Sequence, residues 1–177
     1  MLIALIGAPG AGKDAIGKRL VEQHGFVRFA FADKVRELAY RTLSDSEQLD
    51  IDNLGWDVAK RRSDFYRAHL ERVGDGARKV FGEDFWIEQI REQVKDVLKK
   101  NGDVVITDLR KENEAAFVGV FDLHIFGGAC IWHVHRPGCE RRPFDEWRED
   151  WAAFSIPNFG EIEDLHKHVD ECLELCR

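Results

Sequence analysis

The chain has 177 residues, of which 44% are hydrophobic and 33% are charged, so we expect one globular domain with an ordinary core. Its formal net charge of -7 argues against a nucleic-acid-binding protein, because basic residues that neutralise phosphates supply most of such affinity. Residues 1–6 are apolar but too short for a secretion signal or a membrane span, so we expect a cytoplasmic protein without a membrane partner.

The first predicted element is a strand over residues 2–6, since a continuous apolar run is typical of a parallel strand covered on both faces. Residues 7–13 read Gly-Ala-Pro-Gly-Ala-Gly-Lys, and the helical pattern after them ends at Gly25. A second strand is expected over residues 26–31, and Asp33 is expected to cap the next helix.

The middle of the chain is predicted to be mostly helical. Residues 44–57 are acidic and irregular, which indicates a loop or a mobile link. Residues 58–100 follow a helical pattern with charged faces, in which Gly74 and Gly82 are expected to mark breaks.

The remaining elements alternate in type. Residues 103–108, 130–135 and 154–157 read as strands, and residues 112–120 and 161–176 read as helices. The segment between the last two strands is polar and rich in arginine, which predicts a flap. The final helix is expected to pack internally or against a second subunit, so a homodimer stays open. Its Cys172 and Cys176 lack a second pair at metal-ligand spacing, so we expect reduced thiols and no zinc site.

Strands that alternate with helices predict an α/β fold with a mostly parallel, five-stranded sheet in three α/β/α layers. The expected core covers about residues 1–41 and 102–177 of a single domain. A helical substrate-binding region is expected over about 42–101, and a lid over about 137–153.

The glycine-rich segment predicts a triphosphate site. A helix start presents main-chain N–H groups and a partial positive charge, glycines allow the main chain to approach phosphate oxygens, and a lysine adds a full charge. The segment has the spacing of the Walker A pattern and stands between a strand and a helix. The residues expected to bind ATP here are Gly7, Ala8, Pro9, Gly10, Ala11, Gly12, Lys13, Asp14 and Ala15.

Asp14 occupies the position where the Walker A pattern has a serine or threonine that binds Mg²⁺. A carboxylate is a hard oxygen ligand, so we expect Asp14 to hold Mg²⁺ directly or through water. The alternative is that Asp14 only favours the start of the helix.

A second set of residues points to a phosphorylated acceptor. Asp108 and Arg110 follow a predicted strand, and residues at the carboxyl ends of parallel strands line the ligand crevice. Asp33 has the same placement. The alternative is a local ion pair or turn for Asp108 and Arg110, and a helix cap for Asp33. Trp86 suits a core as well as a base-stacking position. A basic cluster, which would otherwise be a solvated face, contains Lys60, Arg61, Arg62, Arg67, Arg72, Arg78 and Lys79.

These residues together resemble the deoxynucleoside monophosphate kinases of bacteriophages, a branch of the P-loop nucleoside monophosphate kinases. The likeness is scattered but in order over nearly the whole chain, and only the phosphate loop is specific alone. Its pieces are Gly-Lys-Asp at 12–14, Phe-Ala-Asp-Lys at 31–34, residues 74–86, Thr-Asp-Leu-Arg at 107–110 with Asn113 and Glu114, Arg-Pro-Gly at 136–138, and Ile-Pro-Asn-Phe-Gly at 156–160.

The resemblance implies transfer of the γ-phosphate of ATP to a deoxynucleoside 5′-monophosphate with Mg²⁺, in a host cytoplasm if the chain is phage-encoded. Lys13, Arg136 and Asp108 would be catalytic, Arg136 and the flap arginines Arg141, Arg142 and Arg148 would face the donor phosphates, and Asn158 would lie near the ATP base. Ala15 departs from the threonine common in the family. The expected substrate-binding residues are Asp33, Lys34, Arg62, Arg78, Trp86, Asp108, Arg110 and Glu114.

Two other functions fit parts of the pattern. A kinase of another small acceptor, such as dephospho-coenzyme A or a sugar acid, would use the same phosphate loop. An NTP-binding switch would hydrolyse its nucleotide slowly, at a rate that responds to a partner protein.

Overall fold

A computed structural model of the protein describes residues 1–122, 128–143 and 145–176. The chain forms two compact units. The first comprises Met1–Ala30 with Ile90–Arg177, and the second comprises Phe31–Gln89. Residues 31–41 were expected in the core, but they belong to the second unit.

The first unit contains a five-stranded sheet in which every neighbouring pair of strands is parallel. This confirms the sheet expected from the sequence. The order is β2-β3-β1-β4-β5, so the strand that precedes the phosphate loop lies in the centre. The strands are β1 (Leu2–Ile6), β2 (Val27–Phe29), β3 (Val104–Ile106), β4 (Ala129–His135) and β5 (Phe154–Pro157).

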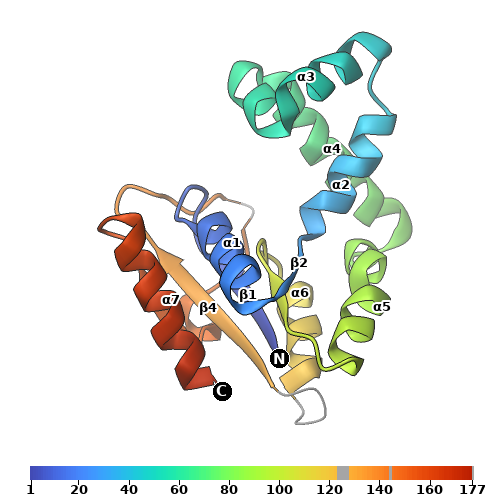
Figure 1. Ribbon diagram of the computed structural model, residues 1–177. Coiled ribbons are helices and arrows are strands. Elements are labelled where there is room, and N and C mark those ends of the chain that lie inside the picture. Colours follow the sequence, from blue (N-terminus) through green and yellow to red (C-terminus); the bar gives the residue numbers. More distant parts are fainter. Residues whose placement is uncertain (123–127, 144, 177) are drawn as a thin grey trace. The chain divides into compact units, whose positions relative to one another are not determined.

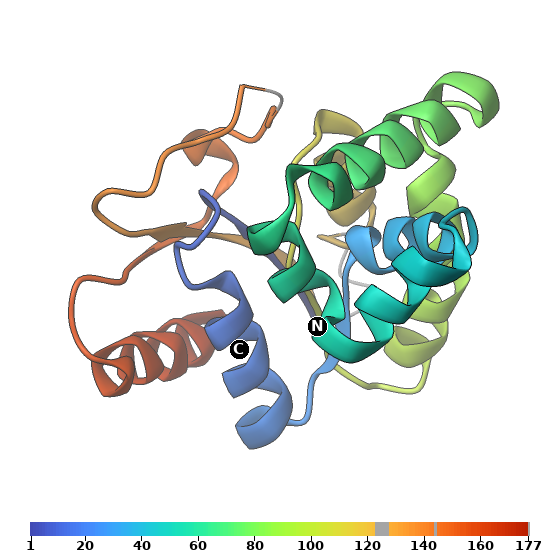
Figure 2. The same cartoon turned by 90° about the horizontal axis from the view of Figure 1, so that it is seen from above.

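Helices cover both faces of this sheet, as expected for three layers. Helices α1 (Lys13–His24) and α7 (Ile162–Cys176) lie side by side on one face (Figures 1 and 2). Helix α6 (Glu112–Gly119) packs on the other face, against β4. The α1–α7 side buries one continuous apolar cluster that includes Leu5, Ile16, Trp132, Ile156 and Val169. Short 3-10 turns follow at η1 (Val120–Asp122) and η3 (Glu149–Trp151).

The second unit is helical. Its helices are α2 (Phe31–Arg41), α3 (Asp45–Arg62) and α4 (Asp64–Phe81), and it includes the start of α5 (Phe85–Lys99). A small apolar cluster of Leu43, Ile51, Ala59 and Tyr66 holds α3 and α4 together. The break expected at Gly82 is confirmed, because α4 ends there.

The expectation of a loop over residues 44–57 is wrong. The Ser44 main-chain N–H donates to the Glu47 carboxylate at 2.8 Å, which closes the first turn of α3. Two of the acidic residues, Asp45 and Glu47, stand in that first turn, where the helix dipole favours negative charge. Gly55 has a φ of 71°, which kinks the helix and obscures its periodicity in the sequence.

Two further boundaries differ from the sequence-based expectation. Helix α2 already begins at Phe31, so Asp33 lies in its first turn and the preceding strand ends at Phe29. Gly74 lies buried inside α4 and does not break it. A β-carbon there would stand 3.5 Å from the Val35 side chain of α2, an ordinary van der Waals distance, so Gly74 packs close to α2. Among the helices that the structure describes, none is long and apolar enough to cross a membrane.

Candidate functional site: a phosphate loop at the carboxyl edge of the sheet

The predicted site residues of the first unit follow the carboxyl ends of its strands. Because all strands are parallel, these ends lie at the same edge of the sheet. An edge of this kind next to a central strand is where open α/β sheets bind ligands. The phosphate loop follows β1, Asp108 and Arg110 follow β3, Arg136 follows β4, and Asn158 follows β5.

The phosphate loop connects β1 directly to α1. Gly7 and Gly12 have φ angles of 143° and 112°, which residues with a side chain rarely adopt. A β-carbon on Gly7 would also collide with the Val134 main-chain oxygen of β4. The turn is closed by Ala11 N–H donating to the Ala8 oxygen at 3.2 Å, and the α1 ladder starts at Gly12. Glycine is therefore required by the course of the main chain.

Lys13 lies over the loop that precedes it. Its Nζ donates to the main-chain oxygens of Gly7 at 2.6 Å and Ala8 at 2.9 Å. Burial, assisted by the charge of Arg110, lowers the pKa of Lys13 to about 8, while the carboxylates of Asp14, Asp145 and Asp108 oppose this shift. The ammonium thus lies at the loop among charged groups from three parts of the unit.

Asp14 is exposed in the first turn of α1, directly after the lysine. Among the described residues, no group of three or more His, Cys, Asp or Glu side chains has the geometry to hold a metal ion. Mg²⁺ differs from a metal held in a protein cage, since it takes one or two carboxylates together with substrate phosphates and water. An exposed carboxylate beside the phosphate loop suits that role.

Asn158 is fixed against the phosphate loop. Its side-chain Nδ2 donates to the Ala11 oxygen at 2.8 Å, and its main-chain N–H donates to the His135 oxygen at 2.8 Å. The residue thus joins the ends of β4 and β5 to the loop. This places Asn158 against the phosphate loop, and its expected proximity to the ATP base stays a prediction.

The residues after β3 are held by the start of α6. The Glu114 carboxylate accepts the main-chain N–H groups of Arg110 at 2.7 Å and Lys111 at 3.0 Å. Glu114 is buried, so this contact gives it a part in shaping the turn. Asp108 and Arg110 are partly exposed, and both charges act on Lys13. The structure thus brings Lys13, Asp108 and Arg110 together, while the contact of Glu114 with substrate remains untested.

Two of the flap arginines contact other residues of the flap. Arg141 donates to the Trp147 oxygen at 3.0 Å and its guanidinium lies over the Trp147 ring, whereas Arg148 forms an ion pair with Asp150. Arg136 is exposed at the end of β4. The flap expected over 137–153 includes Phe144, which lies outside the described residues. The expected contacts of these arginines with donor phosphates stay predictions.

One site residue was missed by the sequence analysis. Asp145, in the flap, is only 3% exposed, and its charge acts on Lys13. In the sequence it stands in a run of charged residues, Arg-Arg-Pro-Phe-Asp-Glu-Trp-Arg-Glu-Asp, where nothing distinguishes a buried carboxylate from solvated ones. Its burial is a property of the folded flap alone.

In the second unit, Asp33 lines a surface groove of about 410 Å³. One face of α2 forms most of this groove, and Trp56 from α3 completes it. The sequence pattern gave no sign of Trp56, because it lies in the segment expected to be a loop. Lys34, next to Asp33, pairs with Glu37 at 3.0 Å. The lining residues are Asp33, Arg36, Glu37, Tyr40, Arg41 and Trp56.

The other expected substrate residues of this unit are spread over α3, α4 and α5. Arg62 is exposed at the end of α3, and Arg78 lies near the end of α4, 3.9 Å from Asp75. Trp86 is 2% exposed, and its ring N–H donates to the Gly74 oxygen at 3.0 Å. Its indole is part of the packed interior, which is the alternative to base stacking that the sequence left open.

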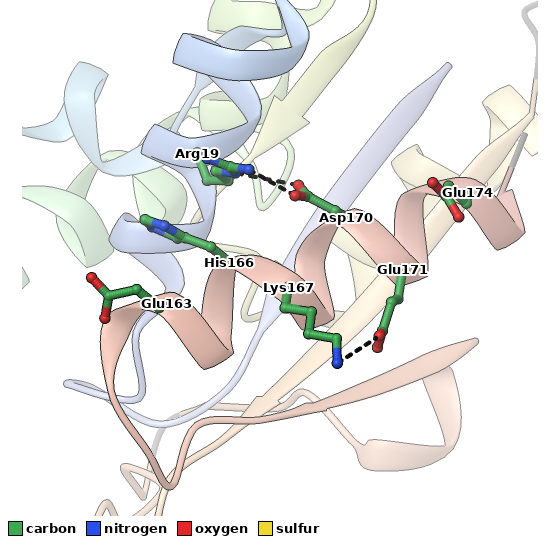
Figure 3. Close-up of a pocket in the computed structure, with 7 residues that line it drawn as sticks. All are labelled: Arg19, Glu163, His166, Lys167, Asp170, Glu171 and Glu174. Atoms are coloured by element: carbon green, nitrogen blue, oxygen red, sulfur yellow. Dashed lines mark hydrogen bonds and ion pairs between the residues drawn. The ribbon is translucent and has the colours of Figure 1, made fainter.

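The first unit has a pocket of about 480 Å³ between α1 and α7 (Figure 3). None of the residues expected to bind nucleotide lines it. Arg19 of α1 donates to Asp170 of α7 at 2.7 Å, and Lys167 lies 3.8 Å from Glu171. The four acidic side chains of the lining outnumber its two cationic ones, so the pocket is unsuited to phosphate. The lining residues are Arg19, Glu163, His166, Lys167, Asp170, Glu171 and Glu174.

Comparisons with known proteins give one relative by sequence and several by structure. No protein-family model matches the chain. A putative deoxynucleotide monophosphate kinase of Acanthamoeba polyphaga mimivirus is 27% identical, over 98% of this chain and 96% of the relative. Dephospho-CoA kinase from Campylobacter jejuni superposes with a TM-score of 0.52 at 13% identity, over 98% of this chain and 95% of that structure. Shikimate kinase from Aquifex aeolicus gives a TM-score of 0.49 at 16% identity, over 98% of this chain and 96% of that structure.

The sheet order, the phosphate loop and the likeness to dephospho-CoA kinase agree on the fold. The chain has the three-layer α/β/α fold of P-loop kinases, which confirms the fold class expected from the sequence. At 13% identity this likeness concerns the fold and leaves the acceptor open.

Proposed function

We propose that the protein is a nucleotide phosphotransferase that transfers the γ-phosphate of ATP to a deoxynucleoside 5′-monophosphate. The observation that carries this proposal is the loop from Gly7 to Lys13, closed over by its lysine at the carboxyl edge of a parallel sheet. The full-length relative named as a putative deoxynucleotide monophosphate kinase supports the choice of acceptor.

The loop is suited to hold the donor phosphates. The start of α1 offers main-chain N–H groups and the positive end of its dipole, and Lys13 adds a positive charge within reach of the loop. Phosphoryl transfer depends mainly on positioning and on stabilising the charge of the moving group. In the reaction, an oxygen of the acceptor phosphate attacks the γ-phosphorus, the bond to the β–γ bridging oxygen breaks, and ADP leaves.

The residues around the loop also fit Mg²⁺. Asp14 is an exposed carboxylate next to Lys13, and Asp145 is a buried one in the flap, of which Oδ1 has no hydrogen-bond partner among the described residues. Carboxylates beside a triphosphate would repel it unless a cation lay between them. When bound, Mg²⁺ would neutralise charge on the phosphates. Asp14 is the residue that we assign to it in place of the hydroxyl of the Walker A pattern.

The groove on the second unit is our candidate for part of the acceptor site. Trp56 and Tyr40 offer aromatic surface, and every kind of base can stack on such side chains. Arg36 and Arg41 offer cationic groups in the same groove, and Asp33 offers an acceptor for a base N–H or a sugar hydroxyl. An aromatic ligand that carries both an anion and hydrogen-bond donors matches this lining.

The experiment that tests the function is an assay of ADP release with Mg²⁺-ATP across a panel of deoxynucleoside and nucleoside monophosphates, with dephospho-coenzyme A as a further acceptor. At least one deoxynucleoside monophosphate should accelerate ADP release well above the rate with ATP alone. Lys13→Ala should lower that rate by about 100-fold or more, because it removes a preorganised charge at the phosphates.

Lys18→Ala is the matched control, since Lys18 is an exposed lysine of the same helix whose contact is Glu22 at 3.7 Å. It should keep full activity. The proposal fails if no monophosphate raises ADP release above the rate with ATP alone. Acceleration by dephospho-coenzyme A but by no monophosphate would instead assign the other kinase activity, and a rate that responds only to a partner protein would indicate a switch.

A further inference from the structure

Asp145 is a buried carboxylate with an unused oxygen. The residue is 3% exposed. Its Oδ2 accepts the Arg142 main-chain N–H at 3.2 Å, whereas Oδ1 is out of contact with solvent and has no hydrogen-bond partner in the described part of the chain. Burial of a charged oxygen without a hydrogen-bond partner is unfavourable, because the oxygen loses its water and gains nothing in exchange. Such an arrangement persists where a ligand supplies the missing partner.

The next residue anchors Asp145 to the rigid part of the first unit. The Glu146 main-chain N–H donates to the Arg110 oxygen at 2.8 Å. Its carboxylate accepts from Lys111 Nζ at 2.8 Å and from the Glu112 main-chain N–H at 3.2 Å. This part of the flap is therefore attached to the turn between β3 and α6. Asp145 is held in place by contacts that do not involve its own free oxygen.

The surroundings of Asp145 decide which partner it takes. Its charge acts on Lys13, as do the charges of Asp14 and Asp108, so three carboxylates influence the lysine of the phosphate loop. Arg110 is the other cation that acts there. A phosphate oxygen cannot be the partner of Asp145, because both are acceptors and both are negative. The partner has to be a hydrogen-bond donor, and a donor that is polarised by a cation suits a carboxylate best.

We propose that Asp145 accepts hydrogen bonds from the water shell of the Mg²⁺ that enters with ATP, and so acts with Asp14 to hold the metal at the phosphate loop. This inference rests on the proposed binding of Mg²⁺-ATP. Asp14 and Ala15 leave the first turn of α1 without the hydroxyl that usually holds this metal. A carboxylate from the flap compensates for that loss, and ties the position of the flap to the presence of the metal.

The test is a measurement of metal affinity that needs no turnover. Mn²⁺, which replaces Mg²⁺ and is visible by electron paramagnetic resonance, is titrated into the full chain bound to a non-hydrolysable ATP analogue. Asp145→Asn should raise the Kd for Mn²⁺ by about 10-fold or more, the usual loss when a hydrogen-bonding partner of a metal's ligands is removed. Glu140→Gln, at an exposed carboxylate of the same flap, should leave it unchanged.

The affinity for the analogue in the presence of EDTA separates this role from a structural one. Asp145→Asn should bind the metal-free analogue as tightly as the wild type or more tightly, because a negative charge is removed from the site. A residue needed only for folding would weaken both affinities together. Asp145→Ser is measured in the same way. Glu146→Gln changes an exposed side chain, so it loosens the anchor of the flap without a substitution in the interior. It should weaken Mn²⁺ binding less than Asp145→Asn does.

A Kd for Mn²⁺ within twofold of the wild type in Asp145→Asn overturns the inference, and so does parallel weakening of both affinities. If neither Asp145 variant folds, the Kd values of Glu146→Gln for Mn²⁺ and for the metal-free analogue are compared with those of the wild type instead. Unchanged Mn²⁺ binding or parallel weakening of both affinities then overturns the inference. Because no acceptor is present, the outcome is independent of the kinase assay. Unchanged Mn²⁺ binding with active phosphate transfer refutes the role of Asp145 alone, whereas weakened Mn²⁺ binding without any transfer refutes the function alone.

Discussion

The Asn158 side chain holds the phosphate loop by donating to the Ala11 oxygen at 2.8 Å, and it occupies the space that a side chain on Gly12 would need. A β-carbon at Gly12 would stand 2.5 Å from Asn158 Nδ2. The end of β5 and the start of α1 are therefore fitted to each other at a single glycine. Loop shape and strand position depend on the same contact.

Gly12→Ala should weaken nucleotide binding by about 10-fold or more. The substitution places a side chain at a φ of 112° and pushes Asn158 away from the loop, and each effect costs on the order of 1 kcal/mol. Titration calorimetry with ADP measures the loss. Gly25→Ala is the control, because Gly25 also has a positive φ, of 72°, but a β-carbon there meets no atom within 4 Å. It should lower the melting temperature and keep ADP affinity, and equal ADP affinities in all three proteins would contradict the prediction.

Asp14→Ala should raise the Mg²⁺ concentration needed for half-maximal turnover by about 10-fold, since it removes the carboxylate that we assign to the metal. The measurement is ADP release at fixed ATP over a range of free Mg²⁺. Asp14→Ser restores the residue type usual at this position and should lie closer to the wild type than Asp14→Ala does. If Asp14→Ala changed neither the Mg²⁺ requirement nor turnover, Asp14 would serve only the start of the helix.

The parts of the site that could be predicted from the sequence are those built by local patterns. Gly7 to Lys13 are contiguous, and the strand ends at Asp108 and Asn158 are marked by apolar runs before them. Parallel strands bring such ends together, so their common edge follows from the order of elements. The sheet and the donor loop were therefore predictable without the structure.

The parts that could not be predicted depend on burial decided elsewhere in the chain. Asp145 is buried because Glu146 attaches the flap to Arg110 and Lys111, which lie 35 or more residues earlier. Trp56 was hidden because the acidic start of α3 and its kink at Gly55 have the composition of a loop. A capping interaction between Ser44 and Glu47 outweighed that composition.

Asp170→Asn should lower the melting temperature at pH 7 by roughly 2 °C, a modest change because exposed ion pairs contribute little. The hydrogen bond that Arg19 donates to Asp170 (Figure 3), together with the contact of Asp170 with the His24 ring, holds the pKa of Asp170 below its ordinary value. A carboxylate whose pKa is lower in the folded than in the unfolded state stabilises the fold at pH values above its unfolded pKa. This stabilisation is lost as the pH falls through its folded pKa. The melting temperatures of wild type and variant should therefore stay apart down to the ordinary pKa of an aspartate, about 3.9, and converge only as the pH falls further.

ADP affinity at pH 7 should be unchanged in Asp170→Asn, because the α1–α7 pocket contains none of the residues assigned to nucleotide. A constant difference between the two melting temperatures from pH 7 to pH 3 would show that the Arg19 contact does not depend on the charge of Asp170.

Trp56→Leu should raise the KM for the preferred monophosphate by about 5-fold to 100-fold with little change in the KM for ATP, because stacking of a base on an aromatic ring contributes about 1–3 kcal/mol. Trp56→Phe keeps a ring in the groove and should give a smaller increase. Phe65→Leu is the matched control, since Phe65 is a 43% exposed aromatic residue of the same unit that does not line the groove.

Thermal melts of the three variants separate this effect from loss of packing, since Trp56 also packs against the cluster around Tyr66. If Trp56→Leu folded and kept the wild-type KM for every monophosphate, the acceptor base would have to bind elsewhere. Asp33 and Lys34, the predicted substrate residues of α2, would then have to act without a base stacked on Trp56. An increase in the KM for ATP alone would instead assign the groove to the donor base.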